Sequence, residues 1–225
     1  MVRVDPAYKD IPGLIKEVLE AHEGKESAWR IGAPSYTTTL ESLLLKEDYK
    51  LMGTADAWII DVNSRRPELP SDILIQRVES IQQLRDMDLV ISRSFPSMPS
   101  NNPQEESPYK TDAEYQQELQ MCTGPNARCL RFVVYDQKNH TPLSTGGVNL
   151  FPKFGLAFMW AGCTVPEARG RGIYSALVTE RMRHAKTHGI ENLGLYAMRD
   201  TSGPIVQAQG FEKHGPVYFF EKNRT

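Results

Sequence analysis

The stretch CTVPEARGRGIYSALVTERMRHAKTHG, residues 163–189, decides the fold, because it places three kinds of local structure in a fixed order. An apolar run ends at Pro166, a short loop with Gly170 and Gly172 follows, and a helix is predicted next. The first turn of a helix has backbone N–H groups without partners and carries partial positive charge. Glycines beside such a turn let a phosphate group approach the backbone closely. The order therefore predicts an anion-binding turn.

The helix predicted after the loop has one face that can pack on a sheet. Apart from Arg181 this face is apolar at helical spacing, and it consists of Tyr174, Leu177, Val178, Arg181, Met182 and Ala185. Gly189 follows it, where a helix often ends in a left-handed residue. Arg169 and Arg171 add positive charge to the loop. Taken alone, the loop is equally consistent with a tight turn that carries two solvated arginines.

The loop and helix resemble the acyl-CoA-binding motif of the GNAT superfamily of N-acetyltransferases. The motif of that family is Arg or Gln, two residues, Gly, one residue, and then Gly or Ala. Arg169, Gly172 and Tyr174 stand at the three key positions, and Tyr174 departs from the pattern because the family has a small residue there. Residues 198–215, MRDTSGPIVQAQGFEKHG, are similar to the closing helix and Gly-Phe turn of the same domain. Two motifs in the right order and spacing make the resemblance much more specific than either alone.

The resemblance implies an α/β protein with the GNAT fold, in which helices flank a central mixed, mostly antiparallel sheet. Residues 67–225 would form the acyl-CoA-binding domain, and residues 1–66 an N-terminal α/β extension similar to the degenerate segment ahead of some GNAT domains. Periodicity and turn residues agree with this layout. The strands are expected at residues 57–62, 73–78, 129–137, 142–151, 154–165, 192–198 and 216–221, with a shorter one near residues 28–33 and a bulge at Gly146 and Gly147.

Helix starts are marked by pairs of a hydroxyl residue and an acidic or amide residue three positions later. Such capping boxes are predicted at Thr38 with Glu41, Ser80 with Gln83, and Thr111 with Glu114, and a further helix is expected from residue 11. Residues 95–110 read as a long irregular loop. By the resemblance this loop would form one wall of the acceptor site, although a plain surface loop is equally consistent with its composition.

Composition limits the classes of partner. The 225-residue chain has a formal net charge of −2 with both signs interspersed, so we expect no nucleic-acid partner. No apolar run is long enough to span a bilayer, and three cysteines without a signal peptide or CxxC pair favour the cytosol. His184 and His188 are one helical turn apart but lack a third ligand nearby, so no metal is expected.

The resemblance also implies where acetyl-CoA or another acyl-CoA would bind as cosubstrate. The pantetheine would lie along the strand that ends at Val165, and the pyrophosphate on the backbone amides of residues 170–175. The residues implied in binding are Cys163, Thr164, Val165, Arg169, Gly170, Arg171, Gly172, Ile173, Tyr174 and Ser175.

The catalytic centre departs from the family pattern. GNAT enzymes are usually described with a tyrosine acid four residues before the Gly of the Gly-Phe turn, and that position is Val206. The strand at residues 154–165 contains no Glu, Asp or His that could serve as the base. Candidate replacements are Tyr174, Tyr196, Cys163, Glu114 and Glu118. Packing is the simpler reading of both Tyr174 and Cys163, and alternation does not decide which way Tyr196 faces.

Three functions fit this pattern. The first is acyl transfer, most simply acetyl transfer from acetyl-CoA to a small-molecule amine, with orientation of the bound reactants supplying most of the rate. The second is an acyl-CoA-binding protein without transferase activity. The third is another acyl-CoA reaction on the same scaffold, such as O-acyl transfer or decarboxylation. We favour the first, an N-acetyltransferase with a divergent centre, and the resemblance allows a homodimer.

Overall fold

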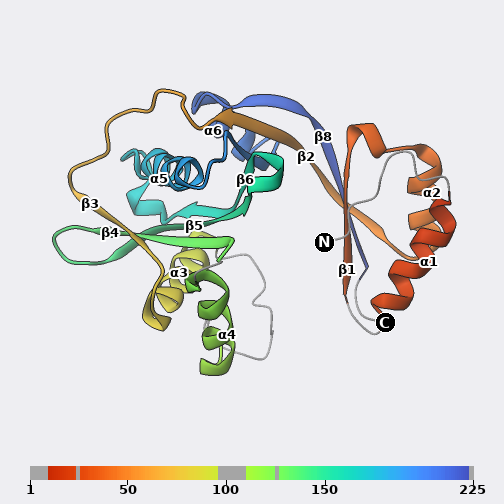
Figure 1. Ribbon diagram of the computed structural model, residues 1–225, viewed down its shortest axis with the longest axis horizontal. Coiled ribbons are helices and arrows are strands. Elements are labelled where there is room, and N and C mark those ends of the chain that lie inside the picture. Colours follow the sequence, from red (N-terminus) through yellow and green to blue (C-terminus); the bar gives the residue numbers. More distant parts are fainter. Residues whose placement is uncertain (1–9, 24–25, 96–109, 125–126, 223–225) are drawn as a thin grey trace. The chain divides into compact units, whose positions relative to one another are not determined.

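The structure is a computed structural model, which describes residues 10–23, 26–95, 110–124 and 127–222. These residues form two compact units, shown in Figure 1. The central unit is residues 59–195, and the terminal unit is residues 1–58 together with residues 196–225. The chain passes from one to the other within β2 (Lys50–Asp61) and within β7 (Asn192–Met198). A division into domains at residues 66 and 67 stays a prediction.

The sheet of the central unit is mixed and mostly antiparallel. Its strands follow the order β7-β6-β5-β4-β3, and the bounds of the four not yet given are β3 (Ile73–Arg77), β4 (Cys129–Asp136), β5 (Pro142–Phe151) and β6 (Leu156–Thr164). Neighbours from β3 to β6 are antiparallel, whereas β6 and β7 are parallel. The parallel pair is the one joined through a helix, as the sequence order of strand, loop and helix requires.

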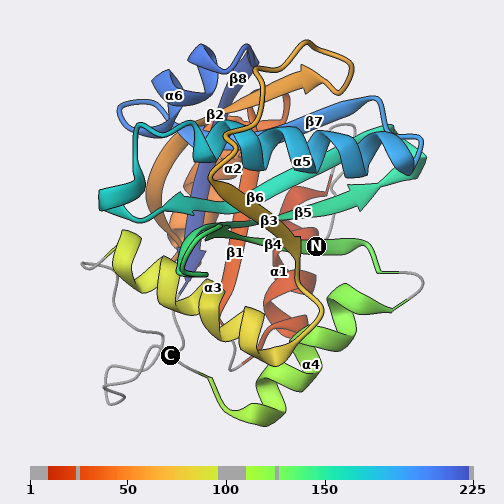
Figure 2. The same ribbon diagram turned by 90° about the vertical axis from the view of Figure 1, so that its left-hand side faces the viewer.

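Helices cover both faces of this sheet. In Figures 1 and 2, α5 (Ile173–Thr187) lies on one face, while α3 (Ile81–Ser94) and α4 (Asp112–Thr123) lie on the other. The capping boxes predicted at Ser80 and Thr111 are both present, so the starts of α3 and α4 are confirmed. The apolar face of α3 packs with α4 and β4 in a core of Val78, Leu84, Met87, Tyr115, Cys122, Val133 and Tyr135.

The terminal unit contains its own core. Its elements with bounds not yet given are α1 (Ile11–Ala21), β1 (Ser27–Gly32), α2 (Thr38–Lys46), α6 (Ser202–Ala208) and β8 (Glu212–Lys222). Strand β8 pairs with β1 in antiparallel register, from Ser27 opposite Lys222 to Gly32 opposite Val217. The core cluster consists of Ile15, Ile31, Leu40, Leu44, Tyr49 and Phe220. The strands predicted at residues 57–62 and 216–221 are present as β2 and β8. Both are longer than predicted, and they start at residue 50 and residue 212.

One predicted cap is displaced by a residue. Thr37, not Thr38, caps α2, since Thr37 has an extended backbone and its side chain accepts from the amide of Leu40 at 3.1 Å. Thr38 is already helical, and the Glu41 carboxylate accepts a hydrogen bond from the Tyr36 hydroxyl. The sequence TTT offers three hydroxyls in a row, so the choice among them was made by the backbone that precedes the helix.

Short 3-10 helices join several elements, at Ala33–Ser35, Pro152–Phe154 and Pro166–Ala168. The left-handed Gly189 expected after α5 is confirmed, with a φ of 69°. Throughout the described part of the chain, no helix has the length and apolar character needed to cross a bilayer. Most of the predicted loop at residues 95–110 lies outside the described residues.

Candidate functional site

The site predicted from the sequence begins at an irregularity in β6. The register with β5 shifts between Thr145 and Gly147, which confirms the predicted bulge, although β6 rather than β5 contributes the extra residue. Ala161 has a φ of 48°, and both Ala161 and Gly162 are exposed. The ladder between β6 and β7 ends at Phe158 and Gly194. The bulge therefore presents β6 backbone to solvent in the second half of the strand.

The loop that follows β6 leads into α5, and the N-cap position of that helix has no side-chain cap. Gly170 and Gly172 have φ values of 80° and 75°, a conformation that favours glycine. Gly172 is the N-cap residue, and no side chain bonds the first-turn amides. The first intrahelical bond runs from the amide of Ala176 to the carbonyl of Gly172, at 3.0 Å. The amides of Ile173, Tyr174 and Ser175 thus form a cradle that suits an anion.

The two arginines of the loop hold its shape. Arg169 donates from Nε to the carbonyl of Thr164 at 3.2 Å and from Nη2 to the carbonyl of Ser94 at 3.4 Å. Arg171 is paired with Asp72 at 2.5 Å and with Asp136 at 3.6 Å, and the hydrogen bond to Asp72 raises its pKa. The charge of Arg171 is therefore largely balanced by carboxylates, while the partners of Arg169 in the described part of the chain are carbonyl oxygens.

A third arginine lies at the cradle, and the sequence analysis missed it. Arg66 comes from the segment between β2 and β3, and donates to the hydroxyl of Ser175 at 3.0 Å and to that of Thr179 at 3.4 Å. Burial lowers its pKa, and the neighbouring Tyr174 phenol opposes that effect. In the sequence, this polar segment with two prolines has the composition of a linker. Two consecutive arginines in it were the only available signal.

The candidate catalytic residues on β6 and α5 are not activated by their surroundings. Cys163 is buried, and burial raises the pKa of its thiol. Burial also raises the pKa of the Tyr174 hydroxyl. A thiol is nucleophilic as the thiolate, so the environment of Cys163 disfavours that role. The third candidate, Tyr196, belongs to the terminal unit, where its ring lies 6.0 Å from that of Phe219 and burial raises its pKa.

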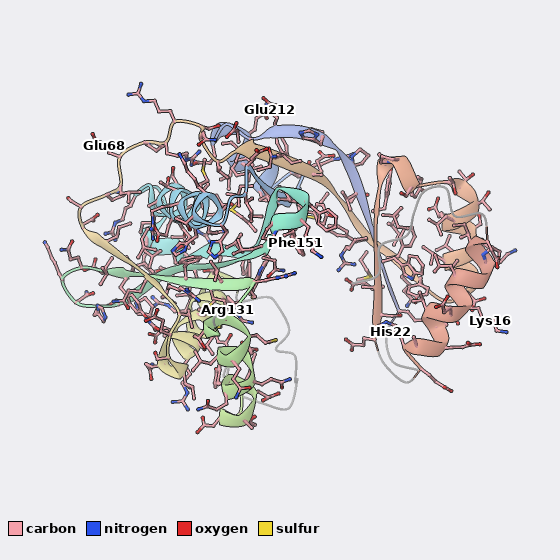
Figure 3. All side chains as sticks on the ribbon, in the orientation of Figure 1. Lys16, His22, Glu68, Arg131, Phe151 and Glu212 are labelled. Atoms are coloured by element: carbon pink, nitrogen blue, oxygen red, sulfur yellow. The ribbon has the colours of Figure 1, made fainter. Side chains whose placement is uncertain are left out.

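The acidic candidates on α4 have structural partners. Glu114 completes the capping box with Thr111. Glu118 pairs with Lys110 at 3.0 Å and with Arg131, the side chain labelled near α4 in Figure 3. Glu114 therefore holds the start of α4, and Glu118 joins α4 to β4 through Arg131. Val206 stands where the family has its tyrosine acid. Its side chain is fully buried in α6, so this position packs in the core and offers no hydroxyl.

The two histidines at the end of α5 have hydrogen-bond partners within the same helix end. His184 lies 3.1 Å from the carboxylate of Glu180, and the hydrogen bond with His184 is the main reason that the pKa of Glu180 falls to about 2. His188 bonds through Nδ1 to the carbonyl of His184 at 2.8 Å. Among the residues that the structure describes, no group of three or more His, Cys, Asp or Glu side chains could hold a metal ion.

A separate pocket lies within the terminal unit. It has a volume of about 570 Å³ and is lined by Asp56, Trp58, Arg199, Gly203, Pro204, Gln207, Phe211, Glu212 and Lys213. Asp56 is buried, and it accepts from Arg199 at 3.1 Å and pairs with Lys213 at 2.7 Å. Burial would raise the pKa of Asp56, but the hydrogen bonds from Lys213 and Arg199 outweigh it and hold the pKa below its ordinary value.

Comparison with known proteins identifies the fold. No family model matches the chain, and no curated protein matches its sequence. A GCN5-related N-acetyltransferase from Kribbella flavida superposes with a TM-score of 0.65 at 15% identity, covering 98% of this chain and 77% of that one. Another from Sphaerobacter thermophilus gives a TM-score of 0.57 at 15% identity, covering 94% of this chain and 64% of that one.

A protein from Staphylococcus epidermidis, described as functionally unknown and conserved, superposes with a TM-score of 0.60 at 18% identity. It covers 96% of this chain and 79% of that one. These neighbours match both units of the chain, because each superposition covers more than nine tenths of it. The fold of this chain is that of the GCN5-related N-acetyltransferases.

Proposed function

We propose that this protein binds acyl-CoA at the start of α5 and transfers the acyl group, most simply acetyl, to a small-molecule amine. The observation that carries the proposal is the uncapped first turn of α5 beside the exposed bulge of β6. The amides of residues 173–175 would bind the pyrophosphate, and the pantetheine would follow β6 toward Ala161 and Gly162. Acyl-CoA acts here as a cosubstrate.

Transfer needs an unprotonated amine, a polarised thioester carbonyl and a proton for the departing thiolate. The free backbone edge of β6 offers N–H groups for the carbonyl, as in other acyl-transfer sites. Orientation of the two bound reactants can supply on the order of 7–11 kcal/mol of the barrier, whereas an acid or base adds roughly 10²–10⁴-fold. A slow transferase therefore needs no tyrosine at the position of Val206.

A second function has specific support. The hydroxyl of Tyr174 and the thiol of Cys163 both have raised pKa values, and Glu114 and Glu118 have other partners. A site that holds acyl-CoA without an acid or base suits a binding protein that senses the cosubstrate.

Free thiols at Cys122, Cys129 and Cys163 support a reducing compartment such as the cytosol. A homodimer stays a prediction.

The first experiment is calorimetric titration with CoA and acetyl-CoA, followed by a thiol-release assay with a panel of amines. Binding with release supports the transferase, and binding without release for every amine supports the sensor. Gly172→Val should abolish measurable CoA binding, because a β-branched residue disfavours the φ of 75° and crowds the cradle.

Gly155→Val is the matched control for this substitution. Gly155 also has a positive φ, 58°, and a side chain there would meet no atom within 4 Å, yet the residue lies at the opposite end of β6. Both variants should lose a similar amount of stability, on the order of 1–3 kcal/mol, but only Gly172→Val should lose CoA. Equal CoA affinity in the two variants would remove the cradle from the proposal.

Arg66 gives a second test of the same site. Arg66→Met should weaken CoA binding about tenfold, because the guanidinium beside Ser175 would face the bound phosphates. Arg65→Met is the control, since Arg65 is the exposed neighbour in the same segment. If both variants bind CoA like the unmodified protein, the phosphates do not lie beside Arg66.

A further inference from the structure

Arg181 is the most deeply buried cation that the structure describes and has no carboxylate beside it. It lies on the sheet-facing side of α5 with 1% of its surface exposed. Its Nε and Nη2 atoms are buried and have no hydrogen-bond partner among the described residues. The neighbouring polar groups that affect its charge are the Tyr174 hydroxyl and the Cys163 thiol. Burying an unpaired guanidinium in this way is costly.

Two glycines on the sheet make room for this side chain. A Cβ on Gly146 would lie 2.6 Å from Nη2 of Arg181, and a Cβ on Gly162 would lie 3.3 Å from the same atom. A side chain at Gly146 would therefore displace the guanidinium, and one at Gly162 would move it by a smaller amount. The Cβ of Gly162 would also lie 3.0 Å from Cε2 of Tyr174. The guanidinium therefore lies against the β5 and β6 backbone at the bulge.

The same place is where a cosubstrate bound at the cradle would carry its acyl group. Gly162 is exposed, and it follows Ala161, the left-handed residue of the bulge. Arg181 is eight residues along α5 from Ile173, a rise of ~12 Å from the cradle. An extended pantetheine arm covers a distance of this order. The acyl end, rather than the nucleotide, would reach the guanidinium.

Burial acts on Arg181 in one direction only. It lowers the pKa of the guanidinium from its ordinary value to about 10, so the side chain remains a cation at neutral pH. A charged group with orphaned donors is strongly stabilised by an anion that accepts those hydrogen bonds. An anion that approached from the side of Gly162 would meet Nη2 first, because a Cβ on Gly162 would lie 3.3 Å from Nη2 and 3.7 Å from Nη1.

Resting on the proposed function, we infer that the acyl-CoA used by this protein carries a carboxylate on its acyl chain, and that Arg181 pairs with that carboxylate. A short dicarboxylic acyl group such as malonyl has the required chemistry. An acyl chain of the same length that ends in a methyl group would leave Nε and Nη2 of Arg181 unpartnered. The guanidinium thus selects the acyl group, and the cradle binds the CoA that carries it.

The test compares malonyl-CoA with butyryl-CoA by calorimetry on the full chain. Butyryl is the uncharged counterpart with the same number of heavy atoms along the chain, because its methyl group stands in place of a carboxylate oxygen. We expect malonyl-CoA to bind at least tenfold more tightly than butyryl-CoA. Arg181→Met should reduce that ratio to near one while leaving the affinity for free CoA within about twofold. Arg183→Met, an exposed arginine on the same helix, should keep the ratio of the unmodified protein.

The outcomes separate the two proposals. If CoA binds but malonyl-CoA and butyryl-CoA bind equally, the pairing with Arg181 is wrong and the cradle stands. A tenfold preference that survives Arg181→Met would also overturn the pairing, because another group would then hold the carboxylate. If neither CoA nor any of its esters binds, the proposed function fails and this inference fails with it. Circular dichroism of each variant establishes that it is folded.

Discussion

Asp56 and Arg181 are both buried charged groups, each with 1% of its surface exposed, but they have opposite surroundings. Asp56, in the terminal unit, is held by Arg199 and Lys213, whose side chains are 49% and 51% exposed. Arg181, in the central unit, has two N–H-bearing atoms without an acceptor. The carboxylate is satisfied by the protein, so its contribution is to stability. The guanidinium lacks such partners, so we expect it to contribute to ligand binding.

This difference shows why burial alone does not identify a site. A buried charge that has partners indicates that the fold depends on those partners, because removing one of them leaves an unpaired charge in the interior. A buried charge without partners reduces the stability of the free protein, and stored destabilisation of this kind is typical of binding and catalytic sites. The two groups therefore predict stability changes of opposite sign when their surroundings are altered.

The largest change should follow removal of both partners of Asp56. The double variant Arg199→Met with Lys213→Met leaves a buried carboxylate unpaired, which typically costs about 3–5 kcal/mol of unfolding free energy. Urea denaturation measures the change. Each single variant should lose less, since one cation remains, and the conservative pair Arg199→Lys with Lys213→Arg should lose the least. A double variant as stable as the unmodified protein would mean that Asp56 is solvated.

A smaller change of opposite sign is expected for Arg181→Met. The substitution fills a similar volume and removes an unpaired buried charge, so the unfolding free energy should rise by roughly 1–3 kcal/mol. The control is Arg183→Met, whose exposed pair with Glu180 should be worth less than about 1 kcal/mol. Destabilisation by Arg181→Met would indicate that the guanidinium is satisfied within the protein, and the comparison with Asp56 would then fail.

The two groups should also differ in how stability depends on pH. The pKa of folded Asp56 lies below its ordinary value of 3.8, so its contribution is present at higher pH and is lost as the pH falls through the folded pKa. The pKa of folded Arg181 is about 10, below its ordinary value, so the unfolded chain binds more protons above pH 10 and stability should rise with pH there. Asp56→Asn and Arg181→Met should flatten the acid and alkaline limbs respectively.

The smallest change is expected for Tyr174→Phe. If the phenol only packs beside Gly162 and Arg181, loss of its hydroxyl should change the unfolding free energy by less than about 0.5 kcal/mol and leave turnover nearly unaltered. A loss of more than 1 kcal/mol would make the hydroxyl a partner of the guanidinium. A large fall in kcat with unchanged stability would instead make Tyr174 a proton donor.

The sequence predicted the elements of the fold well where short-range rules apply. Ser80 with Gln83 and Thr111 with Glu114 marked the starts of α3 and α4, because a capping box is a contact over three residues. It failed by one residue at Thr37, where three threonines compete. The bulge near Gly146 was expected, but its extra residue on β6 was not, because register depends on the partner strand.

The same distinction between local and long-range contacts applies to the candidate site. The order of strand, glycine loop and helix at residues 163–189 determined the cradle on α5 by itself, since the left-handed glycines and the orphaned amides of a first turn are local properties of the chain. Only the tertiary structure placed Arg66 on Ser175, freed Arg181 of partners, and enclosed Asp56 between two cations. The contacts of Arg66 and Asp56 join residues 109 to 157 positions apart. The state of Arg181 depends on a missing neighbour, and no local pattern encodes the absence of a neighbour.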